Sequence, residues 1–208
     1  MTLLDRRRLI AAAALAALAT APLHALATAT VGQSAPDFAL SDTAGKTLRL
    51  SDFKGKTVVL EWTNPGCPFV RKHYDSGNMQ TMQREAVDRG VVWLAVNSTE
   101  TASGDYLSPA KLAAWMQEKR AAPTATLMDE DGKVGRAYGA RTTPHMYIVN
   151  PKGVLVYAGA IDSIPSARVA DIPRATNHVN AALADLAAGK PVAVPATAPY
   201  GCSIKYKS

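Results

Sequence analysis

The stretch at residues 58–70, VVLEWTNPGCPFV, constrains the fold most strongly, because an apolar strand pattern ends there and delivers one cysteine to a helix start. The nearly continuous apolar run at 57–62 predicts a strand that is buried on both faces of a sheet. Cys67 precedes Pro68, a residue that suits the first turn of a helix. Unpaired N–H groups and the helix dipole favour thiolate there, so Cys67 is a candidate redox nucleophile. A buried cysteine that only packs is the alternative.

The first 27 residues have the pattern of a signal peptide. Arg6, Arg7 and Arg8 precede an alanine- and leucine-rich run, and small residues follow at 25–27. We expect the mature chain to begin near Thr28, with an earlier cut after Ala25 as the alternative. The arginines also resemble a twin-arginine export signal, so we expect a periplasmic or otherwise exported protein without stable membrane insertion after cleavage. An uncleaved anchor is the other interpretation.

Charge and cysteine content narrow the class of protein further. The net charge is +6, of which the predicted signal peptide contributes +2. No run of Lys or Arg with interleaved aromatic residues follows, so we expect no nucleic-acid partner. Cys67 and Cys202 are the two cysteines of the chain, and an even number fits an oxidising compartment.

The remaining residues, 28–208, alternate strand and helix patterns and predict one α/β domain with a partly parallel sheet. An N-terminal hairpin is expected between residues 32 and 50, and a second hairpin at 146–157. A helix is expected at 68–89, interrupted near Gly77. Other expected elements are strands at 91–97 and 124–128, helices at 108–120, 129–138 and 174–188, and an irregular tail at 189–208.

Three short motifs occur in order along this domain: Cys-Pro-Phe-Val at 67–70, Thr-Thr-Pro-His at 142–145 and Gly-Cys-Ser-Ile-Lys at 201–205. With the strand before Cys67, they resemble the thioredoxin superfamily, and more closely its peroxiredoxin-like branch of alkyl hydroperoxide reductase and thiol-specific antioxidant domains. The resemblance implies a thioredoxin-like fold, with a central mixed sheet flanked by helices and an N-terminal hairpin. It also implies a thiol-dependent redox protein acting through Cys67 on disulfide, sulfenate or peroxide substrates. The alternative is a non-catalytic binding module that holds a peptide or a metal.

The motifs depart from both parent patterns. In the thioredoxin Cys-x-x-Cys pattern, Cys67 takes the first, exposed position and Val70 replaces the second cysteine. A local dithiol–disulfide cycle is therefore excluded. In a typical peroxiredoxin the reactive cysteine would fall at Val70, and the expected arginine near Pro144. Ordinary peroxiredoxin catalysis does not fit, although Thr63 and Arg141 lie close in sequence to the missing groups.

The resemblance assigns further site residues. It implies a cis peptide bond at Thr143-Pro144, in a loop that faces Cys67 and offers a backbone edge to an incoming peptide. Thr143, Pro144 and Pro68 are thus candidate substrate-binding residues. His145 either faces the site or packs elsewhere. Glu61 matches the buried acid that handles protons behind the cysteine, with a carboxylate reaching solvent as the alternative.

Cys202 lies in a tail segment, 201–204, that we expect to dock on the domain. It is a candidate resolving thiol for Cys67, or else a structural cysteine or one that pairs with another chain. The implied partner is a thiol or disulfide protein or reductant, with a small peroxide as a second substrate. His73, Met79 and Met82 suggest a copper site, but a paired Cys-x-x-x-Cys is lacking, so we expect no metal and no cofactor.

Overall fold

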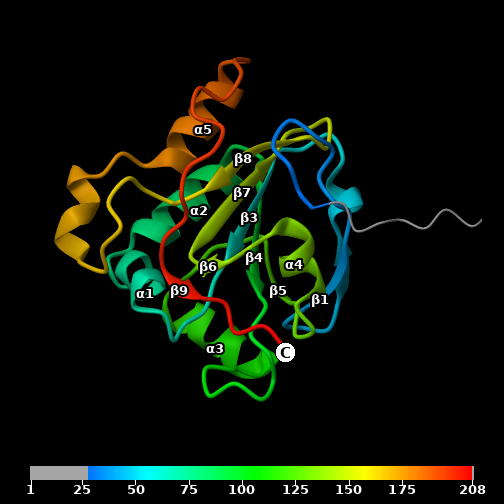
Figure 1. The fold of residues 1–208 in the computed structure, drawn as a ribbon, viewed down its shortest axis with the longest axis vertical. Coiled ribbons are helices and arrows are strands. Elements are labelled where there is room, and N and C mark those ends of the chain that lie inside the picture. Colours follow the sequence, from blue (N-terminus) through cyan, green and yellow to red (C-terminus); the bar gives the residue numbers. More distant parts are fainter. Residues whose placement is uncertain (1–27, 208) are drawn as a thin grey trace, which may run out of the picture.

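The computed structural model describes residues 28–207, and the predicted signal peptide lies outside them. A seven-stranded sheet in the order β2-β1-β5-β4-β3-β7-β8 forms the centre of the domain (Figure 1). Its strands are β1 (Ala39–Asp42), β2 (Thr47–Arg49), β3 (Val58–Trp62), β4 (Val92–Asn97), β5 (Ala125–Met128), β7 (His145–Val149) and β8 (Leu155–Gly159). The helices are α1 (Pro68–Asp75), α2 (Asn78–Asp88), α3 (Pro109–Glu118), α4 (Lys133–Tyr138) and α5 (His178–Ala187), with 3-10 turns η1 (Leu50–Phe53) and η2 (Val169–Arg174). A separate two-stranded pairing joins β6 (Thr142–Thr143) to β9 (Cys202–Ser203).

The sheet is mixed, as the sequence predicts. β3, β4 and β5 run parallel, whereas β7 is antiparallel to β3 and β1 is antiparallel to β5. The N-terminal hairpin is β1–β2, and the second hairpin is β7–β8. Both predicted hairpins are therefore confirmed.

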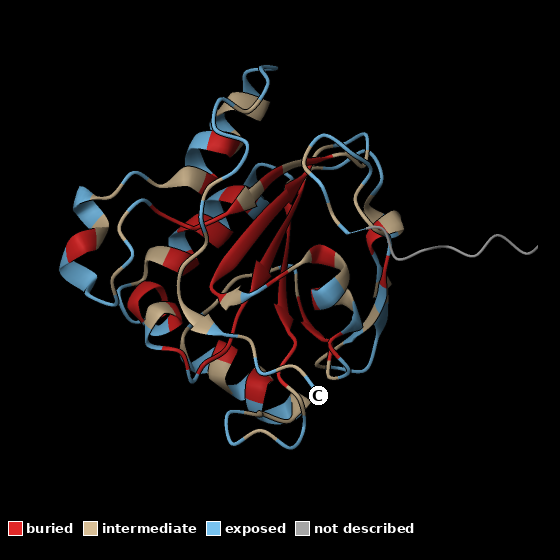
Figure 2. Cartoon of the chain, viewed as in Figure 1, coloured by how far each residue is buried: buried red, intermediate tan, exposed pale blue. Residues whose placement is uncertain are grey.

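Alternate residues of the central strands feed two apolar layers, since successive side chains of a strand point to opposite faces. Val59 packs under α1, α2, α3 and α5, while Val58, Leu60 and Trp62 pack on the other face with Tyr138 of α4. Every residue of β3 and β4 is buried, and Figure 2 shows these strands in red through the middle of the molecule. Burial on both faces explains the near-continuous apolar run at 57–62.

The helix after Cys67 is broken at the predicted place. Gly77 has φ 78° and separates α1 from α2, and this left-handed conformation favours glycine. Two predicted helices begin later than expected. Pro173 lies in the 3-10 turn that precedes α5. Helix α5 begins after Asn177, whose side chain caps it by accepting a hydrogen bond from the Asn180 N–H (2.9 Å). The carboxylate of Asp129 accepts N–H bonds from the first turn of α4 and lies outside that helix.

The C-terminal tail (residues 189–207) is ordered against the domain. It runs from α5 past β8 to β6 (Figure 1). Ala196 bridges Ala158 of β8, and the Thr197 hydroxyl accepts a hydrogen bond from the Ala160 N–H at 2.9 Å. The predicted docking of segment 201–204 is confirmed by the β6–β9 pairing. Among residues 28–207, the helices are too short or too polar to span a bilayer.

Candidate functional site

Cys67 is the residue that caps α1, directly before Pro68 at the first helical position. The turn between β3 and α1 is fixed by Asn64, whose backbone carbonyl accepts from the Cys67 N–H (3.0 Å). The Asn64 side chain accepts from the Gly66 N–H (2.7 Å) and donates to Thr99 Oγ1 (2.8 Å). The local sequence thus holds the sulfur at the positive end of the α1 dipole, as predicted.

The loop at Thr143-Pro144 faces this sulfur. The Thr143-Pro144 bond is cis, and the Cys67 thiol donates a hydrogen bond to the Thr143 carbonyl at 3.0 Å. Both geometric predictions for this loop are confirmed. Its role in binding a substrate remains a proposal.

Cys202 lies beside the same loop. In the β6–β9 pairing, Thr143 is opposite Cys202 and Thr142 is opposite Ser203. Cys67 and Cys202 line one small cavity of about 30 Å³ together with Thr63, and neither cysteine is in a disulfide. By volume this cavity has room for about two water molecules. The structure therefore brings together two cysteines that are far apart in sequence.

The exposed position predicted for Cys67 is wrong. Its side chain is only 3% exposed, because Thr143 and strand β9 cover it. Cys202 itself is half-buried. A reagent reaches the Cys67 sulfur only through the small cavity or after the tail moves.

The two thiols influence each other. Burial raises the pKa of the Cys202 thiol, and hydrogen bonding and charge interaction with Cys67 raise it further, while Lys205 opposes this shift. Cys202 is therefore protonated at neutral pH as long as Cys67 is not oxidised or in a disulfide. When Cys67 sulfur becomes bonded to another sulfur or to oxygen, the contribution of Cys67 to this pKa shift is lost.

A buried polar cluster anchors the tail before Cys202. Lys72 of α1 forms an ion pair with Asp162 (2.9 Å), and both side chains are buried. The Tyr200 hydroxyl donates to the same carboxylate. The Tyr200 ring packs against Phe69 (centroids 5.8 Å apart) and lies 5.6 Å from the Lys72 ammonium. Helix α1 therefore carries both Cys67 and part of the anchor for Cys202.

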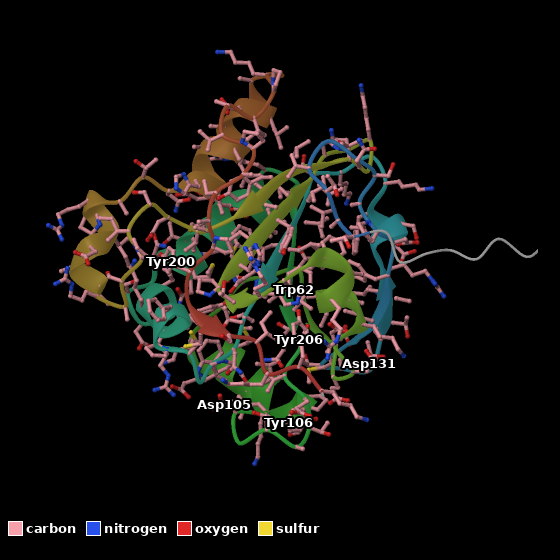
Figure 3. The ribbon with its side chains drawn as sticks, in the orientation of Figure 1. Trp62, Asp105, Tyr106, Asp131, Tyr200 and Tyr206 are labelled. Carbon is pink, nitrogen blue, oxygen red and sulfur yellow. The ribbon has the colours of Figure 1, made fainter. Side chains whose placement is uncertain are left out.

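The tail is also held after Cys202. The Ile204 N–H donates to the Arg141 carbonyl (3.0 Å), and the Glu100 N–H donates to the Lys205 carbonyl (2.8 Å). The Tyr206 hydroxyl donates to the Ala140 carbonyl at 2.8 Å. Figure 3 shows Tyr200 and Tyr206 on the two sides of β9, so the strand is held from both ends.

Glu61 is fully buried, so the alternative of a carboxylate that reaches solvent is wrong. It accepts hydrogen bonds from the Tyr74 hydroxyl (2.8 Å), the Trp93 indole (2.8 Å) and the Gln83 amide (3.1 Å). Burial raises its pKa to about 7, against these hydrogen bonds, which lower it. Thr63, next to Glu61 in the chain, lines the cavity beside Cys67, and its buried hydroxyl has no hydrogen-bond partner among the described residues. Proton handling by Glu61 remains a proposal.

The pKa of Glu61 predicts a pH dependence of stability. The folded carboxyl binds its proton more tightly than the unfolded one, so its contribution is complete below about pH 4.5 and is lost as pH rises through about 7. The shift corresponds to about 3 kcal/mol. We expect Glu61→Gln to remove this loss, measured as the free energy of unfolding in urea from pH 5 to pH 8.

The effect of Glu61 on the pH dependence of stability is isolated by comparing the parent with Glu61→Gln. Burial lowers the pKa of His73 to about 4 and that of His145 to about 3, so both favour the folded state more as pH rises. The informative quantity is therefore the difference between the parent and Glu61→Gln in how the free energy of unfolding changes with pH. Glu85→Gln, at an exposed carboxylate paired with Arg89, should keep the parent's slope. An unchanged slope in Glu61→Gln would contradict the assigned pKa.

His145 packs away from the site. It is buried, and its Nδ1 is 3.2 Å from the Tyr147 hydroxyl, with the two rings 4.5 Å apart. It is not among the residues that line the cavity around Cys67. The packed interpretation of His145 is therefore the correct one.

The residues that suggest a copper site, His73, Met79 and Met82, are buried in the core. Asn78 bonds both His73 Nδ1 (2.8 Å) and the Met82 sulfur (3.6 Å), and Met79 is fully buried. Within residues 28–207, no three His, Cys, Asp or Glu side chains are placed to hold a metal ion.

Several residues at the site carry no recognisable signal in the sequence. Asn64, Thr99 and Asp105 line the cavity, although they come from two different loops, the one between β3 and α1 and the one between β4 and α3. Figure 3 shows Asp105 below the last segment of the tail. Gly201 approaches Thr143 so closely that a Cβ on it would lie 2.0 Å from the Thr143 carbonyl oxygen. The motif around Cys202 contains this glycine, but only the pairing with β6 explains it.

The fold and the site define a thioredoxin-like protein in which a helix-capping cysteine faces a cis-proline loop. The AhpC/TSA family matches residues 31–158, and the chain belongs to this family. This confirms the predicted superfamily and fold class.

Individual relatives agree with this classification. Thiol-disulfide oxidoreductase ResA from Bacillus subtilis (strain 168) is 30% identical over 126 residues, which are 60% of this chain and 64% of ResA, less than two thirds of its length. The crystal structure of an uncharacterized conserved protein from Geobacillus kaustophilus superposes with a TM-score of 0.72 at 30% identity, covering 86% of this chain and 93% of that one. The thioredoxin domain of a thiol-disulfide oxidoreductase from Bacteroides vulgatus gives a TM-score of 0.51 at 22% identity, covering 71% and 98%, and supports the fold alone.

Proposed function

We propose that the protein is a thiol–disulfide oxidoreductase that works through Cys67 and Cys202. The observation that supports this most is the pairing of Thr143 with Cys202, which places the second thiol at the loop whose carbonyl accepts from Cys67. The relationship to ResA, named a thiol-disulfide oxidoreductase, supports the same reaction class. Cys202 thus replaces the cysteine that Val70 removes from the local motif.

In the first step, the Cys67 thiolate attacks one sulfur of a substrate disulfide. A bond forms between Cys67 and that sulfur, the substrate S–S bond breaks, and the other substrate sulfur leaves as a thiolate. The attacking sulfur lies at the start of α1, directly before Pro68. Glu61, with a pKa of about 7, and Thr63 beside the cavity are our candidates for handling the proton that Cys67 gives up.

In the second step, Cys202 resolves the mixed disulfide. Its thiol loses a proton and attacks the Cys67 sulfur, so that a Cys67–Cys202 bond forms and the second substrate thiolate leaves. Two electrons pass from the protein dithiol to the substrate, which becomes two thiols. A dithiol reductant returns the protein to its starting state by the reverse exchange. Formation of the mixed disulfide removes the contribution of Cys67 to the raised pKa of Cys202, while the larger contribution of burial remains.

A small hydroperoxide is a second candidate oxidant, and the cavity of about 30 Å³ beside Cys67 favours it. The Cys67 thiolate would take the terminal oxygen and become a sulfenic acid while an alkoxide or hydroxide leaves. Attack by Cys202 would then form the same disulfide and release water. Both oxidants use the same pair of cysteines.

The binding-module alternative fits the geometry less well. The backbone edge beside Thr143 is already paired with β9 of the same chain.

We also propose that the domain acts after export, on the strength of the signal-peptide pattern in the first 27 residues.

Replacement of Cys202 tests the proposed cycle. With hydroxyethyl disulfide as substrate, Cys202→Ser should release one equivalent of thiol and stop as a mixed disulfide on Cys67, because no second thiol attacks it. Steady-state turnover should fall by about tenfold to a hundredfold, limited by external thiol. Thr47→Ala, which changes an exposed residue of β2 outside the cavity, should turn over like the parent. Full turnover of Cys202→Ser without an accumulated mixed disulfide would exclude the resolving role.

A further inference from the structure

Strand β6 pairs along one backbone edge with strand β9 of the tail, and without the tail this edge would be unpaired. Within the described residues, its sheet partner is β9. Thr143 of β6 is also the residue whose carbonyl is 3.0 Å from the Cys67 sulfur. An unpaired strand edge is a template for an extended peptide, which would gain main-chain hydrogen bonds there and reach the sulfur.

Resting on the proposed function, we propose that β9 occupies this edge as an intramolecular competitor and so selects against polypeptide disulfides as substrates. Small disulfides need no backbone pairing and react through the cavity. An extended peptide has to displace residues 202–203 before it pairs with β6. A tethered competitor acts at an effective concentration of the order of millimolar, so it outcompetes peptides that bind weakly.

Gly201 is the residue that makes this occupancy specific. Its φ is +137°, and a Cβ there would lie 2.0 Å from the Thr143 oxygen and 2.7 Å from the Thr143 carbonyl carbon. Contacts with backbone atoms at such distances are not relieved by a side-chain rotation. A residue with a Cβ at this position therefore pushes β9 away from β6.

The anchor at Tyr200 adds to the occupancy. Its hydroxyl donates to Asp162, whose carboxylate is also bonded by Lys72 (2.9 Å) and by the Ile164 N–H (3.0 Å). Without the Tyr200 hydroxyl, the Asp162 carboxylate therefore still accepts hydrogen bonds from Lys72 and the Ile164 N–H. Tyr200→Phe should loosen the tail without exposing an unpaired charge.

The test measures the first step alone, in a Cys202→Ser background where Cys67 is the one thiol of the mature chain. Three probes are compared by rate: hydroxyethyl disulfide, a five-residue extended peptide whose central cysteine carries thionitrobenzoate, and the same peptide with N-methylated flanking amides. N-methylation removes the donors that pair with a strand edge. Gly201→Ala should raise the rate ratio of the plain peptide to the methylated peptide by about tenfold or more.

Controls make each outcome decisive. Gly104→Ala makes the same change where a Cβ meets nothing within 4 Å, and it should keep the ratio of the background protein. Tyr200→Phe should raise the ratio by a smaller factor, and it replaces Gly201→Ala if that protein does not fold. Amide hydrogen exchange at 202–206 reports whether the tail has left.

Two results would overturn the proposal. One is a background protein that already prefers the plain peptide by about tenfold, since the edge would then be open. The other is an unchanged ratio in a variant whose tail amides exchange fast. A Cys67 that fails to react even with hydroxyethyl disulfide would instead contradict the proposed function itself.

Discussion

A Cys67→Ser protein is expected to lose disulfide reduction by about a thousandfold or more, down to the rate without protein. The sulfur is the group that attacks in both proposed reactions, and a serine hydroxyl at a helix start is a far weaker nucleophile. Turnover of hydroxyethyl disulfide with a coupled dithiol measures the effect.

Cys202→Ser is the matched control, because it makes the same chemical change at the second cysteine that lines the cavity. It should keep the first release of thiol, which Cys67→Ser should lose. Release of one equivalent of thiol by Cys67→Ser at the parent's rate would show that Cys67 is not the nucleophile.

The second large effect concerns stability, and we expect Lys72→Met to lower the free energy of unfolding by about 3–5 kcal/mol. Lys72 is fully buried, and its ammonium is 2.9 Å from Asp162, which is 4% exposed. Methionine keeps the length of the side chain but leaves the Asp162 carboxylate buried without its cation. Urea denaturation at constant pH measures the loss.

Lys119→Met provides the comparison for this prediction. Its ammonium is also 2.9 Å from a carboxylate, that of Asp75, but these side chains are 26% and 47% exposed. A partly exposed pair contributes about 1 kcal/mol or less. Equal losses in the two variants would show that burial of the Lys72–Asp162 pair does not matter.

The sequence predicts the elements around Cys67 well for a physical reason. A strand buried on both faces is apolar along most of its length, and a helix that starts at a proline carries a local signal. β3, α1 and the break at Gly77 therefore lie where the pattern places them. The start of α5 was less predictable, because the preceding residues form a 3-10 turn with similar composition.

The site was predictable only in part. Cys67 and the cis loop come from motifs that carry the family resemblance, and the structure places them together. The burial of Cys67 was not predictable, since it depends on where the tail packs. The buried Lys72–Asp162 pair likewise joins residues that no periodic pattern relates.

Non-reducing peptide mapping of the oxidised protein shows whether Cys67 and Cys202 form a disulfide. One equivalent of hydroxyethyl disulfide is added to the reduced protein, remaining thiols are alkylated, and the digest is analysed by mass spectrometry. We expect a peptide in which Cys67 is linked to Cys202, obtained from monomeric protein. Cys67 found as a lasting mixed disulfide, with Cys202 alkylated or joined to a second chain, would contradict it.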